Sequence, residues 1–174
     1  ANLTFASGVT DQAFSVIVWT NIPDAAASRV LVAKADITTN SSEYALFATI
    51  NDTLTFRLYD STATKVAIRT SDAAITMGSI RMFAATYNGG GGQTAASGII
   101  LYQDAAVIDS TATEDALYVA MRDGTRVLAL GADSVPASYS GESALCRAIV
   151  SGVLTASQLS ALKNLGNGFW GLNL

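Results

Sequence analysis

The sequence contains the stretch Ser79-Ile80-Arg81-Met82-Phe83-Ala84-Ala85-Thr86-Tyr87-Asn88-Gly89, whose pattern is that of a β-strand running into a turn. Its side chains alternate between two faces, with Ile80, Met82, Ala84 and Thr86 on one and Arg81, Phe83, Ala85 and Tyr87 on the other. A period of two residues is the period of a β-strand. The glycine run Gly89–Gly92 frees the backbone, so we expect a mobile loop after the strand.

Period-two alternation continues on both sides of this stretch. It is cleanest over residues 53–60, where Leu54, Phe56 and Leu58 face away from Thr55, Arg57 and Tyr59. The other predicted strands span residues 14–20, 29–34, 43–50, 65–70, 98–103, 106–110, 126–131 and 143–150. The pairs Asn51-Asp52 and Asp104-Ala105 predict hairpin turns. About ten to twelve short strands separated by turns predict an all-β fold, an antiparallel two-sheet jelly-roll sandwich.

One short C-terminal helix is also predicted. Thr155 is a suitable N-cap, and Gln158 stands at the position that completes a capping box. Leu154 precedes the cap and can pack against Leu159 as a hydrophobic staple. Gly166 is a typical helix stop, which predicts a jelly-roll domain over residues 1–166 and an apolar, glycine-rich tail over residues 167–174.

The tail carries the candidate assembly contacts of the chain, which are Phe169, Trp170 and Leu172. Two arrangements stay open: the tail folds back on its own domain, or it docks onto a neighbouring subunit. Half of the residues are hydrophobic (50%) and only 14% are charged. An oligomer contact would use this surplus of apolar surface.

Composition excludes several classes of partner. The net charge is −4 and the ten Lys and Arg residues are scattered, which argues against nucleic acid. The longest uncharged window, residues 82–103, contains Asn88 and the glycine run, so we expect no membrane insertion. No signal peptide is visible, and Ala1 is compatible with removal of an initiator methionine. Cys146 is the single cysteine, and its neighbours predict a buried small hydrophobe.

The residues also argue against an enzyme. The chain has no histidine, which removes Ser-His-Asp and Cys-His catalysis and most histidine-based metal sites. The only glutamates are Glu43, Glu114 and Glu142, and their spacing does not place a nucleophile and an acid on one strand. We therefore expect no catalytic residues.

The order and spacing of several segments carry a family resemblance. These segments are Phe14-Ser15-Val16-Ile17-Val18-Trp19, Leu31-Val32-Ala33-Lys34, Tyr44-Ala45-Leu46, Ala84-Ala85-Thr86-Tyr87-Asn88-Gly89, Ile100-Leu101-Tyr102-Gln103-Asp104 and Leu154-Thr155-Ala156-Ser157-Gln158-Leu159. Together they resemble the laminin-G-like, or concanavalin A-like, jelly-roll domains of bacteria and phages over nearly the whole chain. The chain departs from that pattern at Ile80-Arg81-Met82, where the family usually has Trp-His-His, and at Asn88, where it usually has Asp.

The resemblance identifies no certain cofactor and makes calcium the candidate, since laminin-G-like domains often hold calcium with oxygens of the rim loops. Calcium takes several carboxylate, amide and carbonyl oxygens. The candidates are Asp11, Asp36, Asp52, Asp60, Asp104 and Asp133. Aspartate is equally suited to hairpin turns, and for each residue taken singly we favour the turn interpretation.

Glycan binding would use exposed aromatic rings beside amide or carboxylate groups. Two pairs at strand ends have this character and are the candidate ligand-binding residues, Tyr59 with Asp60 and Tyr87 with Asn88. The competing interpretation is that the tyrosines cover sheet edges or pack in an interface.

The function that best fits these expectations is a non-enzymatic virion surface protein of the phage type, such as a head-decoration, fibre or tail-associated subunit. Its partners would be other virion proteins or copies of itself, with cell-surface glycans as a further partner. The alternative is a carbohydrate-binding or adhesion module of a secreted bacterial protein, which would be extracellular.

Overall fold

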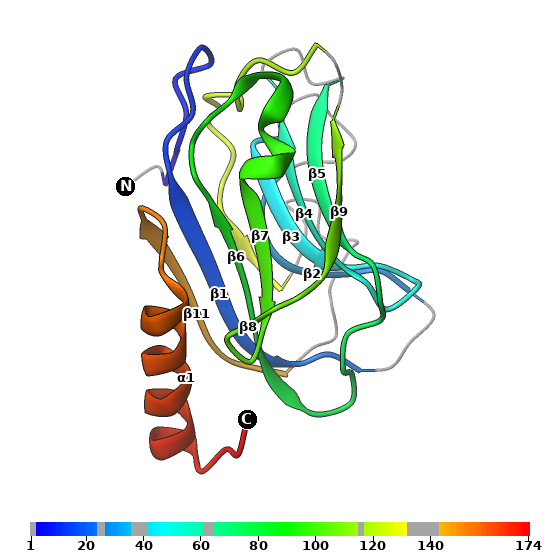
Figure 1. Cartoon of the computed structure of the whole chain (residues 1–174), viewed down its shortest axis with the longest axis vertical. Coiled ribbons are helices and arrows are strands. Elements are labelled where there is room, and N and C mark those ends of the chain that lie inside the picture. Colours follow the sequence, from blue (N-terminus) through cyan, green and yellow to red (C-terminus); the bar gives the residue numbers. More distant parts are fainter. Residues whose placement is uncertain (1–2, 24–26, 36–41, 61–64, 115–116, 132–142) are drawn as a thin grey trace.

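The computed structural model describes residues 3–23, 27–35, 42–60, 65–114, 117–131 and 143–174. These residues form two antiparallel β-sheets that face each other, with one helix outside them (Figure 1). The five-stranded sheet has the order β11-β1-β6-β7-β8, and the six-stranded sheet has the order β10-β2-β3-β4-β5-β9. The prediction of an all-β, two-sheet sandwich with one C-terminal helix is confirmed.

The element bounds follow the predicted strands closely. The strands are β1 (Phe14–Asn21), β2 (Arg29–Lys34), β3 (Tyr44–Ala48), β4 (Leu54–Tyr59), β5 (Val66–Ser71), β6 (Ile80–Tyr87), β7 (Ile99–Gln103), β8 (Ala106–Val107), β9 (Ser110–Glu114), β10 (Ala129–Leu130) and β11 (Ser143–Ser151). The helix is α1 (Ala156–Trp170), and two 3-10 turns, Gly92–Thr94 and Ala96–Gly98, precede β7.

Two predicted strands differ from the structure. The strand expected over residues 106–110 is divided, because β8 stays in the five-stranded sheet while β9 pairs with β5 in the other sheet. The Ile108 N–H still donates to Leu101 O at 3.0 Å, whereas the Asp109 carbonyl already accepts the Asp72 N–H at 2.9 Å. The chain therefore changes sheet between these two residues. The strand expected over residues 126–131 is reduced to β10, the two residues that pair with β2.

The main core lies between the sheets and is formed by alternate residues of the strands. Leu54, Phe56 and Leu58 of β4 point into it, as their alternation predicted. Phe14 of β1 lies near its centre, with its ring centroid 4.3 Å from Phe5 and 5.7 Å from Phe56. Aromatic pairs at these separations bind the two sheets together across the core.

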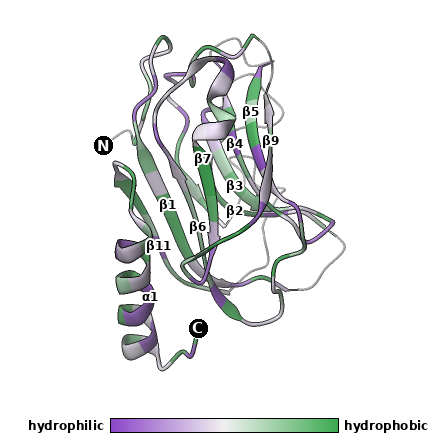
Figure 2. Cartoon of the chain, in the orientation of Figure 1, coloured by the Kyte–Doolittle hydropathy of each residue, from purple (hydrophilic) through white to green (hydrophobic). Residues whose placement is uncertain are grey.

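Part of the other face of the five-stranded sheet is buried as well, because α1 lies beside β11 there (Figure 1). Met82 and Ala84, which alternate with core-facing Phe83, are fully buried in this second apolar cluster together with Leu159 of α1. Apolar residues accordingly run along β1 and β7, while α1 has both polar and apolar stripes (Figure 2). The stretch Ile80-Arg81-Met82 therefore contributes a methionine to the second apolar cluster.

Helix α1 begins as predicted and ends later than predicted. Thr155 and Gln158 form the complete capping box, and Leu154 and Leu159 both belong to the second apolar cluster. The helix passes through Gly166 and ends at Trp170, with Gly171 in the left-handed conformation as its cap (φ 66°). An added Cβ on Gly166 would lie only 2.8 Å from Trp19 Nε1, so this glycine allows close packing on the sheet instead of stopping the helix.

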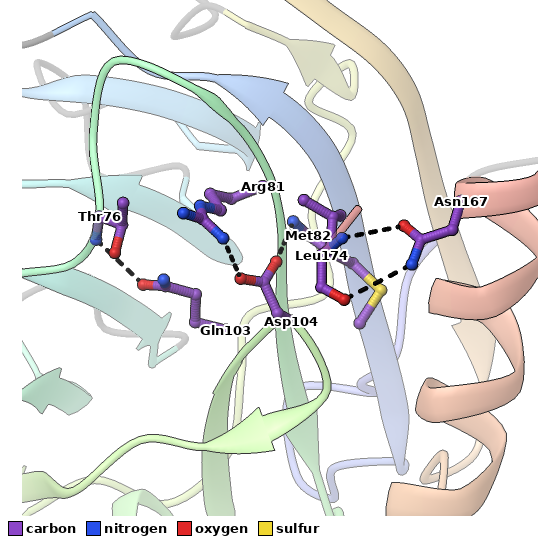
Figure 3. A network of polar contacts seen from close by, with 7 residues as sticks. All are labelled: Thr76, Arg81, Met82, Gln103, Asp104, Asn167 and Leu174. Carbon is purple, nitrogen blue, oxygen red and sulfur yellow. Dashed lines mark hydrogen bonds and ion pairs between the residues drawn. The ribbon is translucent and has the colours of Figure 1, made fainter. Parts of the chain in front are cut away.

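Four residues of the predicted tail are therefore helical, and its remainder returns to the domain. Trp170, Leu172 and Leu174 pack against the second apolar cluster. The Asn167 side chain closes the turn by pairing with the main chain of Leu174, at 3.4 and 3.5 Å (Figure 3). Of the two arrangements that the sequence left open, the structure has the tail folded back on its own domain. No helix among the described residues is long and apolar enough to cross a membrane.

Candidate binding sites

The four predicted ligand-binding residues lie at one end of the sandwich, and three of them are buried. Tyr59 is 8% exposed, Asp60 is 1% exposed and Tyr87 is fully buried, so no tyrosine ring of this set presents a face to a sugar. Asn88 is exposed, but its side chain accepts the Gly90 N–H at 2.9 Å. The expectation of exposed aromatics at these strand ends is wrong, because neighbouring loops cover them.

Tyr87 and Asp60 instead belong to a network that holds residues 117–121 against the end of the sandwich. The Tyr87 O–H donates to Asp11 Oδ2 at 2.6 Å, and the Tyr118 O–H donates to the same oxygen at 3.0 Å. Asp11 Oδ1 accepts the Met121 N–H at 2.6 Å, and Asp60 Oδ2 accepts the Val119 N–H at 2.7 Å. Burial raises the pKa of Asp11 despite these hydrogen bonds. This network, which we call the loop clamp, holds residues 117–121 in place and has a structural role.

The glycine run Gly89–Gly92 is part of the same clamp and not the free loop that was expected. The Gly91 N–H donates to the Tyr87 hydroxyl at 2.8 Å, and the Gly92 N–H donates to Val119 O at 2.7 Å. An added Cβ on Gly89 would lie 2.6 Å from Ala13 N. Glycine is required here because two stretches of backbone approach closely and φ is positive, +77° at Gly89.

The structure describes four of the six candidate calcium ligands, and no three of these four come together. Asp11 and Asp60 are occupied by the hydrogen bonds above, and Asp52 lies in a tight turn with φ 58°. Asp104 also lies in a turn, where its carboxylate binds Arg81 Nη1 at 3.1 Å and the Met82 N–H at 3.0 Å (Figure 3). Asp36 and Asp133 lie outside the described residues. Within the described part of the chain, no group of three metal-ligating side chains comes together.

The sequence did not reveal a buried ion pair between the last residue of β2 and the residue before β3. Lys34 Nζ lies 2.6 Å from Glu43 Oε1, and both side chains are 1% exposed. The Gly124 N–H donates to the same carboxylate oxygen at 3.1 Å, and Lys34 Nζ also donates to Thr4 Oγ1. Burial raises the pKa of Glu43, even though Lys34 lies beside it. The pair joins three chain segments at one place and is enclosed by protein, so we assign it a structural role.

The outer face of the six-stranded sheet carries a half-buried cation between two aromatic rings. Arg57 projects from β4 on the face opposite Phe56, and its guanidinium carbon lies 5.4 Å from the centroid of Phe47 and 5.7 Å from that of Tyr59. Both separations fall in the range of cation–π contacts. Arg57 Nε is buried and has no hydrogen-bond partner among the described residues. We call Phe47, Arg57 and Tyr59 the arginine cluster.

A second feature lies on the outer face of the five-stranded sheet, between α1 and β11. It is a cavity of about 290 Å³ that we call the helix groove. Its lining is wholly apolar and consists of Ile17, Trp19, Cys146, Ala148, Val150, Leu162, Leu165, Gly166, Phe169 and Trp170. Two predicted assembly residues thus line the groove, Phe169 at 79% exposure and Trp170 packed edge-on to Trp19 at 5.7 Å. Cys146 is half-buried here among apolar neighbours.

Two facing antiparallel sheets of five and six strands define a jelly-roll sandwich of the lectin-like class. The chain belongs to the concanavalin A-like lectin/glucanase superfamily, whose family model matches residues 1–160. This confirms the resemblance seen in the sequence. No curated protein matches the chain.

Solved structures share the fold at low sequence identity. A carbohydrate-binding module of the Ruminococcus gnavus IT-sialidase, bound to α2,3-sialyllactose, is 12% identical with a TM-score of 0.62, over 90% of this chain and 84% of that one. The same module bound to α2,6-sialyllactose is 14% identical with a TM-score of 0.60, over 90% and 85%. A structure of botulinum neurotoxin type C, a toxin whose cell entry depends on interaction with two ganglioside molecules, is 12% identical with a TM-score of 0.60. The match covers 88% of this chain, which spans only 36% of the toxin chain.

Proposed function

We propose that this chain is a non-enzymatic binding domain that recognises acidic glycans through the arginine cluster. The observation that carries the proposal is the Arg57 guanidinium, held between Phe47 and Tyr59 on the outer face of the six-stranded sheet. A planar guanidinium binds a carboxylate with two parallel hydrogen bonds, which a lysine cannot do. The adjacent rings orient the guanidinium, and the half-buried ring of Phe47 offers apolar surface to the sugar.

Two further facts support this proposal. The structurally similar sialidase modules were solved with sialyllactose, a glycan that carries a carboxylate. The chain has no histidine, and Tyr87 and Asp60 are buried in the network around Asp11, which leaves the arginine cluster, with Tyr59 as one of its members, as the better placed polar and aromatic combination. A guanidinium between two aromatic rings suits recognition and supplies no acid–base pair for hydrolysis.

Titration of the protein with sialyllactose and with lactose tests this proposal. We expect sialyllactose to bind and lactose to bind at least about tenfold more weakly, because a charge-assisted hydrogen bond contributes about 1.5–3 kcal/mol. Arg57→Lys should lose the preference for the sialylated sugar. Lys163→Ala removes one positive charge from α1, on the other sheet, and is the matched control that should bind as the wild type does. Equal binding of both sugars would refute the role of the carboxylate.

We propose, as a second candidate, that the domain is displayed on the surface of a virion and contacts its neighbours through β11. This strand has nine residues and stands at the edge of its sheet, with pairing on one side only among the described strands. An exposed edge strand can pair with another chain. Leu145 on β11 (41% exposed) and Phe169 on α1 add apolar surface beside that edge.

Sedimentation of the purified chain, alone and with phage particles, tests this second candidate. We expect a defined oligomer or association with particles, and Leu145→Lys should weaken either one by placing a charge beside the edge. Ile100→Lys is the matched control, because Ile100 is exposed to the same degree (40%) on a strand inside the sheet. A monomer that does not bind particles would contradict the virion assignment and leave the glycan proposal untouched.

A further inference from the structure

We propose that the side chains of Lys34 and Glu43 condense into an amide, which gives the domain an internal cross-link between the end of β2 and the residue before β3. The reaction needs only this chain, so the inference does not depend on the glycan or the virion proposal. Three properties of the pair carry it: the contact of the amine with the carboxyl group, the enclosure of both, and one carboxyl oxygen without a partner.

The two reacting groups are held in contact by the backbone. The Glu43 N–H donates to Lys34 O at 2.8 Å, which places the two side chains together, and Lys34 Nζ lies 2.6 Å from Glu43 Oε1. The carboxyl carbon is one bond further on, so the reacting atoms lie within about 4 Å, close to the separation of about 3–3.5 Å at which bound groups react. Groups held in this way react as if their concentration were about 10⁵–10⁸ M.

The enclosure of the pair favours a neutral product. Both side chains are 1% exposed. Burial raises the pKa of Glu43 and thereby favours its protonated form. Transfer of a proton from the ammonium to the carboxylate gives an amine and a carboxylic acid, which are the two groups that can condense. A buried ion pair loses hydration that its attraction repays only in part, whereas an amide carries no charge.

The hydrogen bonds around the pair fit the amide better than the ion pair. Glu43 Oε2 is buried and has no hydrogen-bond partner among the described residues, which is costly for a carboxylate oxygen. In the amide this oxygen has left as water. The oxygen that remains accepts the Gly124 N–H at 3.1 Å, and the one N–H that remains has Thr4 Oγ1, which already accepts from Lys34 Nζ, as its acceptor. Each polar atom of the product therefore has a partner that is already in place.

The same two neighbours assist the reaction. Lys34 Nζ attacks the carboxyl carbon of Glu43, so that a C–N bond forms and the bond from this carbon to one oxygen breaks. The Gly124 N–H stabilises the negative charge that develops on Oε1. The Thr4 hydroxyl hydrogen-bonds to both side chains, so it can carry the proton from the nitrogen to the departing oxygen. One water molecule leaves, and no oxidant, cofactor or second substrate is consumed.

Mass spectrometry of the intact, denatured wild-type protein tests the cross-link. We expect a mass about 18 Da below that of the sequence, which is the mass of one water molecule. Trypsin then locates the loss, because it cuts after arginine and lysine but not after an acylated lysine. The tryptic sites on either side of Lys34 are Arg29 and Arg57. The cross-linked protein should therefore give one peptide of residues 30–57 that lacks one water.

The peptide map also separates the amide from other ways of losing water. A cyclic imide at Asp123-Gly124 would lower the mass equally, but trypsin would still cut after Lys34 and release residues 30–34 and 35–57. Only the amide between Lys34 and Glu43 both removes a water and protects this site.

Three variants assign the roles. Lys34→Arg keeps the positive charge but does not condense with a carboxyl group, so its mass should equal that of its sequence. Lys163→Arg makes the same change on α1 and is the matched control, which should keep the loss of water. Thr4→Val removes the hydroxyl and should slow cross-linking at least about tenfold in a time course after cell-free synthesis, with the peptide map as the readout.

Three results would overturn the inference or part of it. A wild-type protein that has the full mass of its sequence and is cut after Lys34 would show that the pair stays ionic, whatever the glycan titrations give. A loss of water that persists in Lys34→Arg would place the reaction elsewhere. Cross-linking at an unchanged rate in Thr4→Val would remove Thr4 from the reaction. If a variant fails to fold, the intact mass and the peptide map of the wild type still decide the matter.

Discussion

Replacing Gly166 by alanine measures how closely α1 packs on the sheet. In an exposed helix interior, glycine to alanine stabilises a protein by about 0.5–1 kcal/mol. At Gly166 the added Cβ would lie 2.8 Å from Trp19 Nε1 and 3.0 Å from Trp170 Cζ3. Both rings are packed against each other, so one of them must move by several tenths of an ångström. Overpacking of this kind costs about 1–3 kcal/mol.

Gly168 provides the matched control in the same helix. It is exposed, and an added Cβ there would meet nothing within 4 Å. Gly168→Ala should therefore raise the free energy of unfolding, whereas Gly166→Ala should lower it or leave it unchanged. The intrinsic helix term cancels in the difference between the two variants, which should equal the overpacking cost of about 1–3 kcal/mol. Urea unfolding followed by tryptophan emission gives both values. Equal stabilisation by the two substitutions would refute the close contact of α1 with Trp19.

Three other predictions concern stability. Tyr87→Phe removes the hydroxyl that joins Asp11 to Gly91, and urea unfolding should show a loss of about 1–3 kcal/mol, with unchanged binding of sialyllactose. A loss of glycan binding at unchanged stability would contradict this structural role. Burial raises the pKa of Asp11 from 3.8, so the folded state holds this proton more tightly than the unfolded state. The stability that Asp11 contributes is thus present below about pH 4 and is lost as the pH rises through the raised pKa. The free energy of unfolding should fall as the pH rises through this range in the wild type and not in Asp11→Asn. The same pH dependence in both proteins would argue against a raised pKa of Asp11. Thr155→Ala removes the N-cap of α1 and should cost about 1 kcal/mol in thermal unfolding, whereas Thr113→Ala, at an exposed strand position, should cost less.

Local patterns in the sequence predicted the strands and the start of the helix, because these depend on neighbouring residues. The alternation of β4 and the capping box of Thr155 and Gln158 both act within a few residues. The end of α1 instead depended on a residue that is far away in the sequence, Trp19. Glycine permits both a left-handed helix cap and a close contact, and only the position of Trp19 shows that Gly166 serves the second purpose.

The binding sites were less predictable for the same reason. Tyr87 stands at a strand end, where an aromatic ring can be exposed, but Asp11, 76 residues away, and residues 117–121 enclose it. The arginine cluster needs β3 and β4 in register, so that Phe47 and Tyr59 flank Arg57. The apolar tail did indicate the helix groove, since Phe169 and Trp170 line it, although the tail docks on its own domain.

The central claim is that an acidic glycan binds at the arginine cluster. Chemical-shift mapping of the isotope-labelled protein with sialyllactose tests it most directly. We predict that the largest shifts fall on Phe47, Arg57 and Tyr59 and on the strands β3 and β4 that carry them, and that lactose produces none of them. Shifts confined to the rim around Asn88, or the same shifts with lactose, would contradict the claim.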